Sequence, residues 1–140
     1  ISGGDEMMKA SLIERKKTKI LGVSILTSLD SNQTHKYYNE KNIENLVKKF
    51  VKQAKKIGLD GIVCSPKEIK YVRKETGKNF IIVTPGIRPK KSKNIKDDQK
   101  RILSPLEAIN LGADFLVIGR PITQSKDPLK TLKEINKSLS

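Results

Sequence analysis

Four short apolar runs stand out along a chain that is otherwise rich in polar and charged residues. Within each run the apolar residues are nearly continuous and do not alternate with polar ones. Strands that are buried on both faces of a parallel sheet have this pattern, whereas half-exposed strands alternate. The pattern therefore predicts four buried strands, over Leu21–Leu26, Gly61–Cys64, Phe80–Val83 and Phe115–Ile118.

A helical pattern follows each predicted strand. The clearest example is an apolar stripe whose residues fall on one face of a helix. The stripe consists of Ile43, Leu46, Val47, Phe50, Val51, Ala54 and Ile57. Ser65 and Ser104 are each followed by proline and then by a glutamate three residues after the serine, which is typical of helix N-termini. Three glycines stand where helices are expected to end, namely Gly58, Gly77 and Gly112.

The alternation of strands and helices predicts a parallel βα repeat. Residues 58–63 and 112–117 look like two copies of one helix-to-strand connection. A helix is predicted over Glu6–Lys17 with no strand before it, so we expect the chain to begin inside a larger architecture. Four βα units are half of an eight-stranded barrel, which usually has about 250 residues. The predicted fold is therefore α/β, the C-terminal half of a TIM (β/α)8 barrel, with residues 1–140 forming one partial barrel domain.

Composition narrows the class of protein. The 140 residues carry a formal charge of +14, but 24 of the 29 basic residues are lysines spread along predicted helices. Aromatic residues make up only 4%, which leaves few stacking platforms for single strands, so nucleic-acid binding is disfavoured. No apolar run is long enough to span a membrane. The single cysteine, Cys64, fits a reducing compartment, and we expect a cytoplasmic protein.

Candidate chemistry follows the last two predicted strands. In βα barrels the active site lies at the C-terminal ends of the strands, and phosphate often binds after strands seven and eight. The third strand is followed by Thr84-Pro85-Gly86-Ile87-Arg88 and the fourth by Gly119-Arg120-Pro121. Arginine can place two donors on phosphate oxygens, and glycine lets backbone N–H groups approach an anion. The combination predicts a phosphate site.

The segment from Arg88 to Arg101 is long, basic and polar, and it is either a plain connection or a lid over an anion. Its Gln99 carries an amide that can donate to phosphate. Asp97 and Asp98 precede it, but no set of histidine, cysteine and carboxylate ligands accompanies them, so no metal site is predicted.

Other polar residues are weaker candidates. Cys64 ends a buried strand, and the only histidine, His35, falls in a polar segment predicted to be a loop, away from Cys64. Asp60 and Asp114 precede their strands, on the face of a barrel that is associated with stability. Asp30 follows a strand, but a lone acidic loop residue is usually solvent-facing. None of these residues is assigned a catalytic role.

Taken together, the motifs resemble those of orotidine 5'-phosphate decarboxylases, in order and spacing, over nearly the whole chain. The matching segments are Ser2-Gly3-Gly4 with Glu6-Met7-Met8, Leu26-Thr27-Ser28, Val63-Cys64-Ser65, Val83–Arg88, Asp97-Asp98-Gln99 with Arg101-Ile102, and Val117–Thr123 with Asp127-Pro128. The resemblance implies that this chain binds orotidine or uridine 5'-monophosphate without metal or organic cofactor. It implies that Thr27 and Ser28 lie at the pyrimidine and Pro85 along its edge. It places Arg88, Gln99, Gly119 and Arg120 at the phosphate.

The chain departs from that family at one point. The family's catalytic lysine and aspartates lie in an Asp-x-Lys-x-x-Asp motif on an early strand, and no segment of this sequence matches it. We therefore expect no catalytic residue here, and no activity from this chain alone. The alternatives are an inactive remnant, another phosphosugar lyase of the same superfamily and, less favoured, a basic nucleic-acid-binding protein. The expected partners are a second copy or a chain that supplies the N-terminal half.

Overall fold

The computed structural model describes residues 1–89 and 103–139, which contain a four-stranded parallel sheet. Its strands are β1 (Leu21–Val23), β2 (Gly61–Val63), β3 (Ile81–Thr84) and β4 (Phe115–Leu116). They pair in chain order, β1-β2-β3-β4, and every pairing is parallel. All four predicted strands are present, and the predicted half-barrel of parallel βα units is confirmed.

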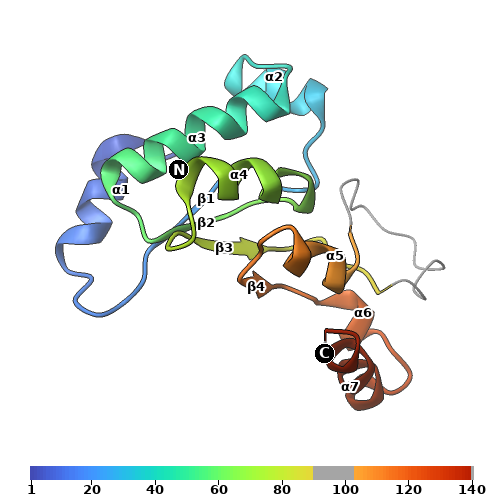
Figure 1. The fold of residues 1–140 in the computed structure, drawn as a ribbon. Coiled ribbons are helices and arrows are strands. Elements are labelled where there is room, and N and C mark those ends of the chain that lie inside the picture. The colour runs from blue at the N-terminus through green and yellow to red at the C-terminus, as the bar shows by residue number, and fades with distance from the viewer. Residues whose placement is uncertain (90–102, 140) are drawn as a thin grey trace.

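Helices connect successive strands and cover one side of the sheet, and further helices precede β1 and follow β4. They are α1 (Gly4–Ile13), α2 (Ser31–Tyr38), α3 (Ile43–Ile57), the 3-10 turn η1 (Pro66–Glu68), α4 (Ile69–Thr76), α5 (Pro105–Asn110), α6 (Arg120–Thr123) and α7 (Pro128–Lys137). Figure 1 shows α3 and α4 lying side by side along the sheet, with α7 set apart near the C-terminus. Among the described residues, none of the helices combines the length and the apolar character that a membrane crossing requires.

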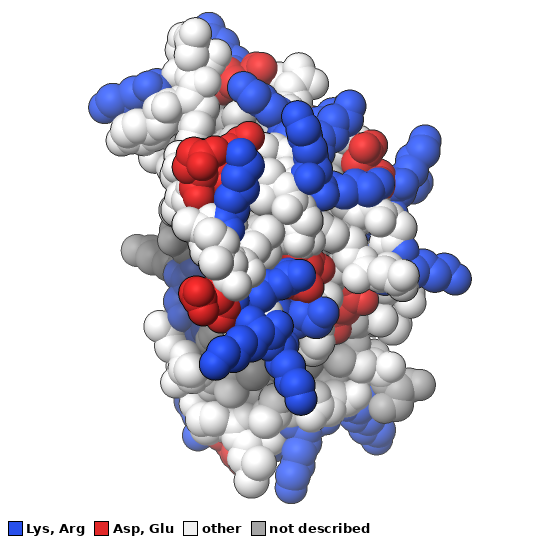
Figure 2. All heavy atoms as spheres, turned by 90° about the vertical axis from the view of Figure 1, so that its left-hand side faces the viewer, with Lys and Arg blue, Asp and Glu red and all other residues white. Residues whose placement is uncertain are grey.

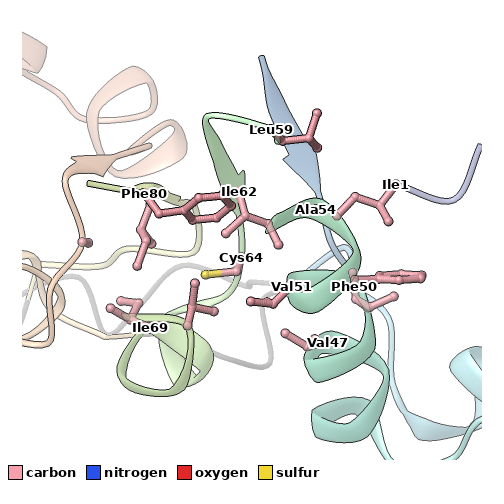
Figure 3. Packing of buried hydrophobic residues seen from close by; sticks show 14 of the residues in the cluster. Ile1, Val47, Phe50, Val51, Ala54, Leu59, Ile62, Cys64, Ile69 and Phe80 are labelled. Atoms are coloured by element: carbon pink, nitrogen blue, oxygen red, sulfur yellow. The ribbon is translucent and has the colours of Figure 1, made fainter. Parts of the chain in front are cut away.

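The core forms where the stripe of α3 meets the sheet. Val47, Val51 and Ala54 are fully buried and point toward Ile62 and Cys64 of the β2 segment, as Figure 3 shows. Burying such side chains stabilises the fold by about 1.5–3 kcal/mol each. Gly58 ends α3 in the left-handed conformation, at φ 90°, which glycine adopts without steric cost. The predicted apolar stripe is therefore the element that fixes the helix layer on the sheet.

The two faces of the sheet differ sharply in exposure. Ile62 and Ile82 lie on the helix-covered face, and neither is accessible to solvent. The next row on the opposite face runs across Val23, Val63, Val83 and Phe115. At the two edge strands this row is open, since Val23 is 46% and Phe115 59% exposed. An apolar row of this kind is what the remaining strands of a barrel would cover.

Three predicted strands are longer than the observed ones, since β2 ends at Val63 and not Cys64, β4 ends at Leu116 and not Ile118, and β1 differs most. The sequence predicted Leu21–Leu26, whereas β1 ends at Val23. The Ser24 N–H and hydroxyl both donate to the carbonyl oxygen of Val63, at 3.0 and 2.8 Å. Pairing with β2 thus ends at Ser24, and the apolar residues Ile25 and Leu26 continue into a turn.

Candidate functional site

The predicted ligand-binding residues lie beyond one edge of the sheet, at the carboxyl ends of the strands. Val23, Val83 and Phe115 belong to one row of paired residues. Counting four residues onward from each of them reaches Thr27, Ile87 and Gly119. Because the strands are parallel, these positions lie past the same edge. The segments that carry the predicted pyrimidine and phosphate contacts therefore face one end of the half-barrel.

Thr27 and Ser28 lie in the turn that joins β1 to α2. The turn is closed by a hydrogen bond from Leu29 N–H to the Leu26 oxygen, at 3.0 Å. Thr27 is buried and Ser28 is half-buried. Directly after them Asp30 caps α2, accepting from the N–H groups of Asn32 and Gln33 at 3.1 Å. The carboxylate of Asp30 thus has a structural role, which the sequence analysis did not foresee.

His35 does not lie in a loop, as the sequence analysis expected, but within α2. The helix lacks an apolar stripe, so hydrophobic periodicity gave no sign of it. Its start is instead specified by a reciprocal capping box, in which the Gln33 side chain also accepts from the Asp30 N–H at 3.0 Å.

The segment after β3 contains a glycine in the left-handed conformation, and hydrogen bonds beyond it fix the backbone of Arg88. Gly86 has φ 77°, a conformation that side-chain-bearing residues rarely adopt. Ile87 is fully buried and forms a parallel bridge with Leu103. The Arg88 N–H donates to the Leu103 oxygen at 2.9 Å, and Arg88 Nη1 donates to the Ile87 oxygen at 2.9 Å. The Arg88 side chain is half-buried, as is the ring of Pro85.

Thr84, the first residue of the Thr-Pro-Gly-Ile-Arg motif, faces the other way. Its side chain is fully buried on the helix-covered face, alongside Ile82. Its hydroxyl makes no hydrogen bond within residues 1–89 and 103–139. Thr84 therefore belongs to the core.

Gly119 and Arg120 form the corresponding end of the β4 segment. Gly119 is exposed, and a Cβ added to it would have no heavy atom of residues 1–89 or 103–139 within 4 Å, so none of these residues fills the space beside its backbone. Its carbonyl oxygen accepts from the N–H groups of Ile122 and Thr123, at 2.8 and 3.0 Å, which starts α6. Arg120, the first residue of α6, is half-buried. The Gly119 N–H and the Arg120 guanidinium are thus donors on adjacent residues at the end of the β4 segment.

The remaining candidates from the sequence are Gln99, the residues considered for a metal site, Cys64 and the basic surface. Gln99, with Asp97 and Asp98, lies outside the described residues. In the described part of the chain, no group of three or more histidine, cysteine, aspartate or glutamate side chains is placed to hold a metal ion. Cys64 is buried in the core. Figure 2 shows lysines and arginines spread over one face of the molecule with acidic side chains between them.

The described pockets do not coincide with the predicted site. A pocket of about 570 Å³ lies between α5 and α7 and is lined by residues including Ser104, Glu107 and Thr131. None of the described residues assigned to the nucleotide lines it.

Comparisons with known proteins agree with the fold and the motifs. The family model described as "Orotidine 5'-phosphate decarboxylase / HUMPS family" matches residues 1–135. An orotidine 5'-phosphate decarboxylase of Wolbachia pipientis is 46% identical over 142 residues, covering 100% of this chain and 62% of the relative. One from Coxiella burnetii is 44% identical over 145 residues, covering 99% of this chain and 61% of the relative.

A solved structure extends the agreement to three dimensions. The orotidine 5'-phosphate decarboxylase of Lactobacillus acidophilus superposes with a TM-score of 0.81 at 30% identity, over 99% of this chain and 60% of that one. This chain thus spans about three fifths of the length of the relatives it matches. With a family model covering nearly its whole length, the chain belongs to the orotidine 5'-phosphate decarboxylase / HUMPS family.

Proposed function

We propose that this chain is the nucleotide-binding part of an orotidine 5'-phosphate decarboxylase, which converts orotidine 5'-monophosphate into uridine 5'-monophosphate in pyrimidine biosynthesis. The observation that carries the proposal is the common placement of two arginine-bearing segments. Thr84 of β3 and Leu116 of β4 are partners in the parallel pairing of these strands. Arg88 comes four residues after Thr84, and Arg120 comes four residues after Leu116. Two guanidinium groups at neighbouring strand ends suit a phosphate dianion, because each can donate two parallel hydrogen bonds.

The other proposed contacts follow from the same edge. Thr27 and Ser28, in the turn after β1, would contact the pyrimidine, with Pro85 along its edge. Arg88, Arg120 and the Gly119 N–H would hold the phosphate. Gln99 is proposed as a further phosphate donor from its sequence motif, and it lies outside the described residues. The space beside Gly119, which no described residue fills, supports its assignment, since an anion can approach the backbone there.

The proposed role of this chain is nucleotide binding and does not include the decarboxylation step. Decarboxylation in this family requires a lysine that protonates the reacting carbon beside charged aspartates, and no Asp-x-Lys-x-x-Asp motif occurs in this sequence. Phosphate binding cannot replace a proton donor at the reacting carbon. The chemistry would therefore need this motif from another polypeptide or from the missing half of the barrel. We expect the purified chain to show no turnover of orotidine 5'-monophosphate, and sustained product formation by it would contradict this assignment.

A second candidate function is that of another phosphosugar lyase, since the family description joins two groups of enzymes. The curated relatives that match at 44–46% identity are named orotidine 5'-phosphate decarboxylases, which favours the first candidate. The two differ in whether the ligand must carry a base. A preference for uridine 5'-monophosphate over a pentose phosphate lacking the base supports the decarboxylase assignment, and the reverse preference supports the other lyase.

The phosphate assignment is tested by ligand titration of this chain. Uridine 5'-monophosphate should bind more tightly than uridine, and Arg120→Ala should remove most of that difference. Loss of the charge-assisted bonds should weaken nucleotide binding about ten- to hundredfold. Lys126→Ala removes an exposed positive charge shortly after α6 and is the matched control. Equal losses for the two variants would indicate general attraction to positive charge and would refute the Arg120 assignment.

A further inference from the structure

We infer that the capping box of Ser104 and Glu107 is a positioning device for Arg88, so that Glu107 controls phosphate affinity without touching the ligand. The inference rests on the proposed function and deepens it. It assigns a role to a side chain that is not among the predicted nucleotide contacts and lies on a different element, α5.

The first step is the link between Arg88 and Leu103. Ile87 and Leu103 form a parallel bridge beyond the end of β3, and the Arg88 N–H donates to the Leu103 oxygen at 2.9 Å. The backbone of Arg88 therefore takes its position from Leu103. A displacement of Leu103 moves the root of the Arg88 side chain with it.

The second step is the link between Leu103 and Glu107. Leu103 directly precedes Ser104, the N-cap of α5, which keeps an extended backbone at φ −71° and ψ 159°. The Ser104 N–H donates to Glu107 Oε2 at 2.9 Å, and the Ser104 hydroxyl also bonds to that oxygen. The Glu107 side chain thus holds the residue at which the chain changes from the bridge into the helix.

The third step is the attachment of both ends to the core. On the Arg88 side, Ile87 is fully buried. On the α5 side, Ala108 is fully buried, and its N–H donates to the Ser104 oxygen at 3.1 Å. Between these two buried residues, the capping box constrains the backbone conformation at Ser104 and with it the position of Leu103. Loss of the capping box should leave the buried residues in place and loosen the Arg88 backbone.

The chain contains a built-in comparison for this device. Ser65-Pro66-Lys67-Glu68 repeats the pattern, and the Ser65 N–H donates to Glu68 Oε2 at the same 2.9 Å. The residue before it is Cys64, whose N–H bonds to the Val83 oxygen within the sheet. Glu68 is also the more buried of the two glutamates. The Glu68 box therefore has a comparable structural role, but the residue before it donates its N–H to Val83 and not to a proposed phosphate contact.

The experiment compares Glu107→Ala, Glu107→Gln and Glu68→Ala in this chain, with uridine 5'-monophosphate and uridine as probes and urea unfolding as the stability measure. Glu107→Ala should weaken nucleotide binding about three- to tenfold, which corresponds to loss of a helix cap. Uridine binding should not change. Glu107→Gln should restore most of the affinity, because glutamine also completes a capping box. Glu68→Ala should lose at least as much stability with unchanged nucleotide affinity.

Three results would overturn the inference. Equal affinity losses in Glu107→Ala and Glu68→Ala would show that affinity follows stability alone. Equal losses for nucleotide and uridine would show that the phosphate end is not the part affected. Unchanged nucleotide affinity in Glu107→Ala, with normal binding by the unmodified chain, refutes the positioning role and leaves the proposed function intact. If the unmodified chain binds no nucleotide, the proposed function fails and the inference fails with it.

Discussion

Arg73 and Asp114 are joined by an ion pair that closes the amino-terminal edge of the sheet, with Arg73 Nη2 2.6 Å from Asp114 Oδ2. The same guanidinium donates to the Gly112 oxygen at 2.6 Å and to the Phe80 oxygen at 2.8 Å. Asp114 in turn accepts from the Ile82 N–H at 2.7 Å. One arginine of α4 thus connects the end of its own helix, the start of β3 and the turn before β4.

Replacing Arg73 should be costly for stability. Arg73→Ala removes several charge-assisted bonds and leaves their carbonyl acceptors without this donor, which should lower the free energy of unfolding by about 2–4 kcal/mol. Arg73→Lys should recover little, because an ammonium group cannot reproduce the planar fork of donors. Urea unfolding measures both variants. Lys74→Ala, at the exposed neighbouring position, is the control and should change stability by about 0.5 kcal/mol or less. A similar cost at both positions would contradict the role given to Arg73.

Asp60, in the turn before β2, also accepts from a backbone N–H group and pairs with basic side chains, as Asp114 does before β4. It should make the stability of the chain depend on pH. It accepts from the Ile20 N–H at 2.9 Å and pairs with Arg15 and Lys19. The Ile20 hydrogen bond first, and then the two cations, hold the pKa of the carboxyl below its ordinary value of 3.8. A lowered folded-state pKa contributes stability that is present above 3.8 and is lost as the pH falls through the folded-state pKa.

The test compares the unmodified chain with Asp60→Asn at two pH values. At about pH 7 the variant should be less stable by about 1 kcal/mol, because it lacks the charge that Arg15 and Lys19 contact. Below the folded-state pKa the carboxyl is protonated, so the difference should shrink toward zero. A difference that stays constant down to the acid limit would show that packing, and not charge, accounts for the contribution of Asp60.

Two glycine substitutions should separate folding from ligand binding. A Cβ at Gly61 would lie 2.2 Å from the Ile81 oxygen, whereas a Cβ at Gly119 would meet no atom of the described residues within 4 Å. Gly61→Ala should therefore destabilise the sheet by about 1–3 kcal/mol or more. Gly119→Ala should leave the free energy of unfolding nearly unchanged but weaken nucleotide binding, because the methyl group occupies the space proposed for phosphate. A Gly119→Ala variant that binds as tightly as the unmodified chain would exclude close approach of the anion at that backbone.

The open face of the sheet should drive association. Its exposed apolar residues include Val23, Phe115 and Val117, on or beside the two edge strands. Apolar faces of this kind, together with unpaired strand edges, favour pairing with another chain. We expect sedimentation at micromolar concentration to show dimers or larger species, or a complex with a chain that supplies the first half of the barrel. Phe115→Glu should reduce self-association, whereas Ile13→Glu, at an exposed position ending α1, should not. A compact monomer at all concentrations would contradict this prediction.

The sequence predicted the parts of the fold that depend on local pattern. The apolar runs around Ile62 and Ile82 and the stripe of α3 are strong signals, because strand and helix spacings differ and both sets of residues are buried. The polar helix α2 was missed, since its start depends on the Asp30 capping box and not on an apolar stripe. The bridge between Ile87 and Leu103 was not predictable either. It joins residues far apart in the chain, and neither carries a side-chain motif that marks the pairing.

Asp60 and Asp114 each accept a hydrogen bond from a backbone N–H group at the amino-terminal edge of the sheet. These stabilising contacts therefore lie at one end of the strands, and the proposed ligand contacts lie at the other. Substitutions at the two ends should therefore have different effects, on stability at the amino-terminal edge and on ligand binding at the carboxyl-terminal edge. If the proposed contacts bind the ligand, a change at Arg120 or Gly119 should weaken binding in a chain that still folds. The amount of folded chain would then not report whether the chain still binds its ligand, and the two ends of the strands would tolerate different substitutions.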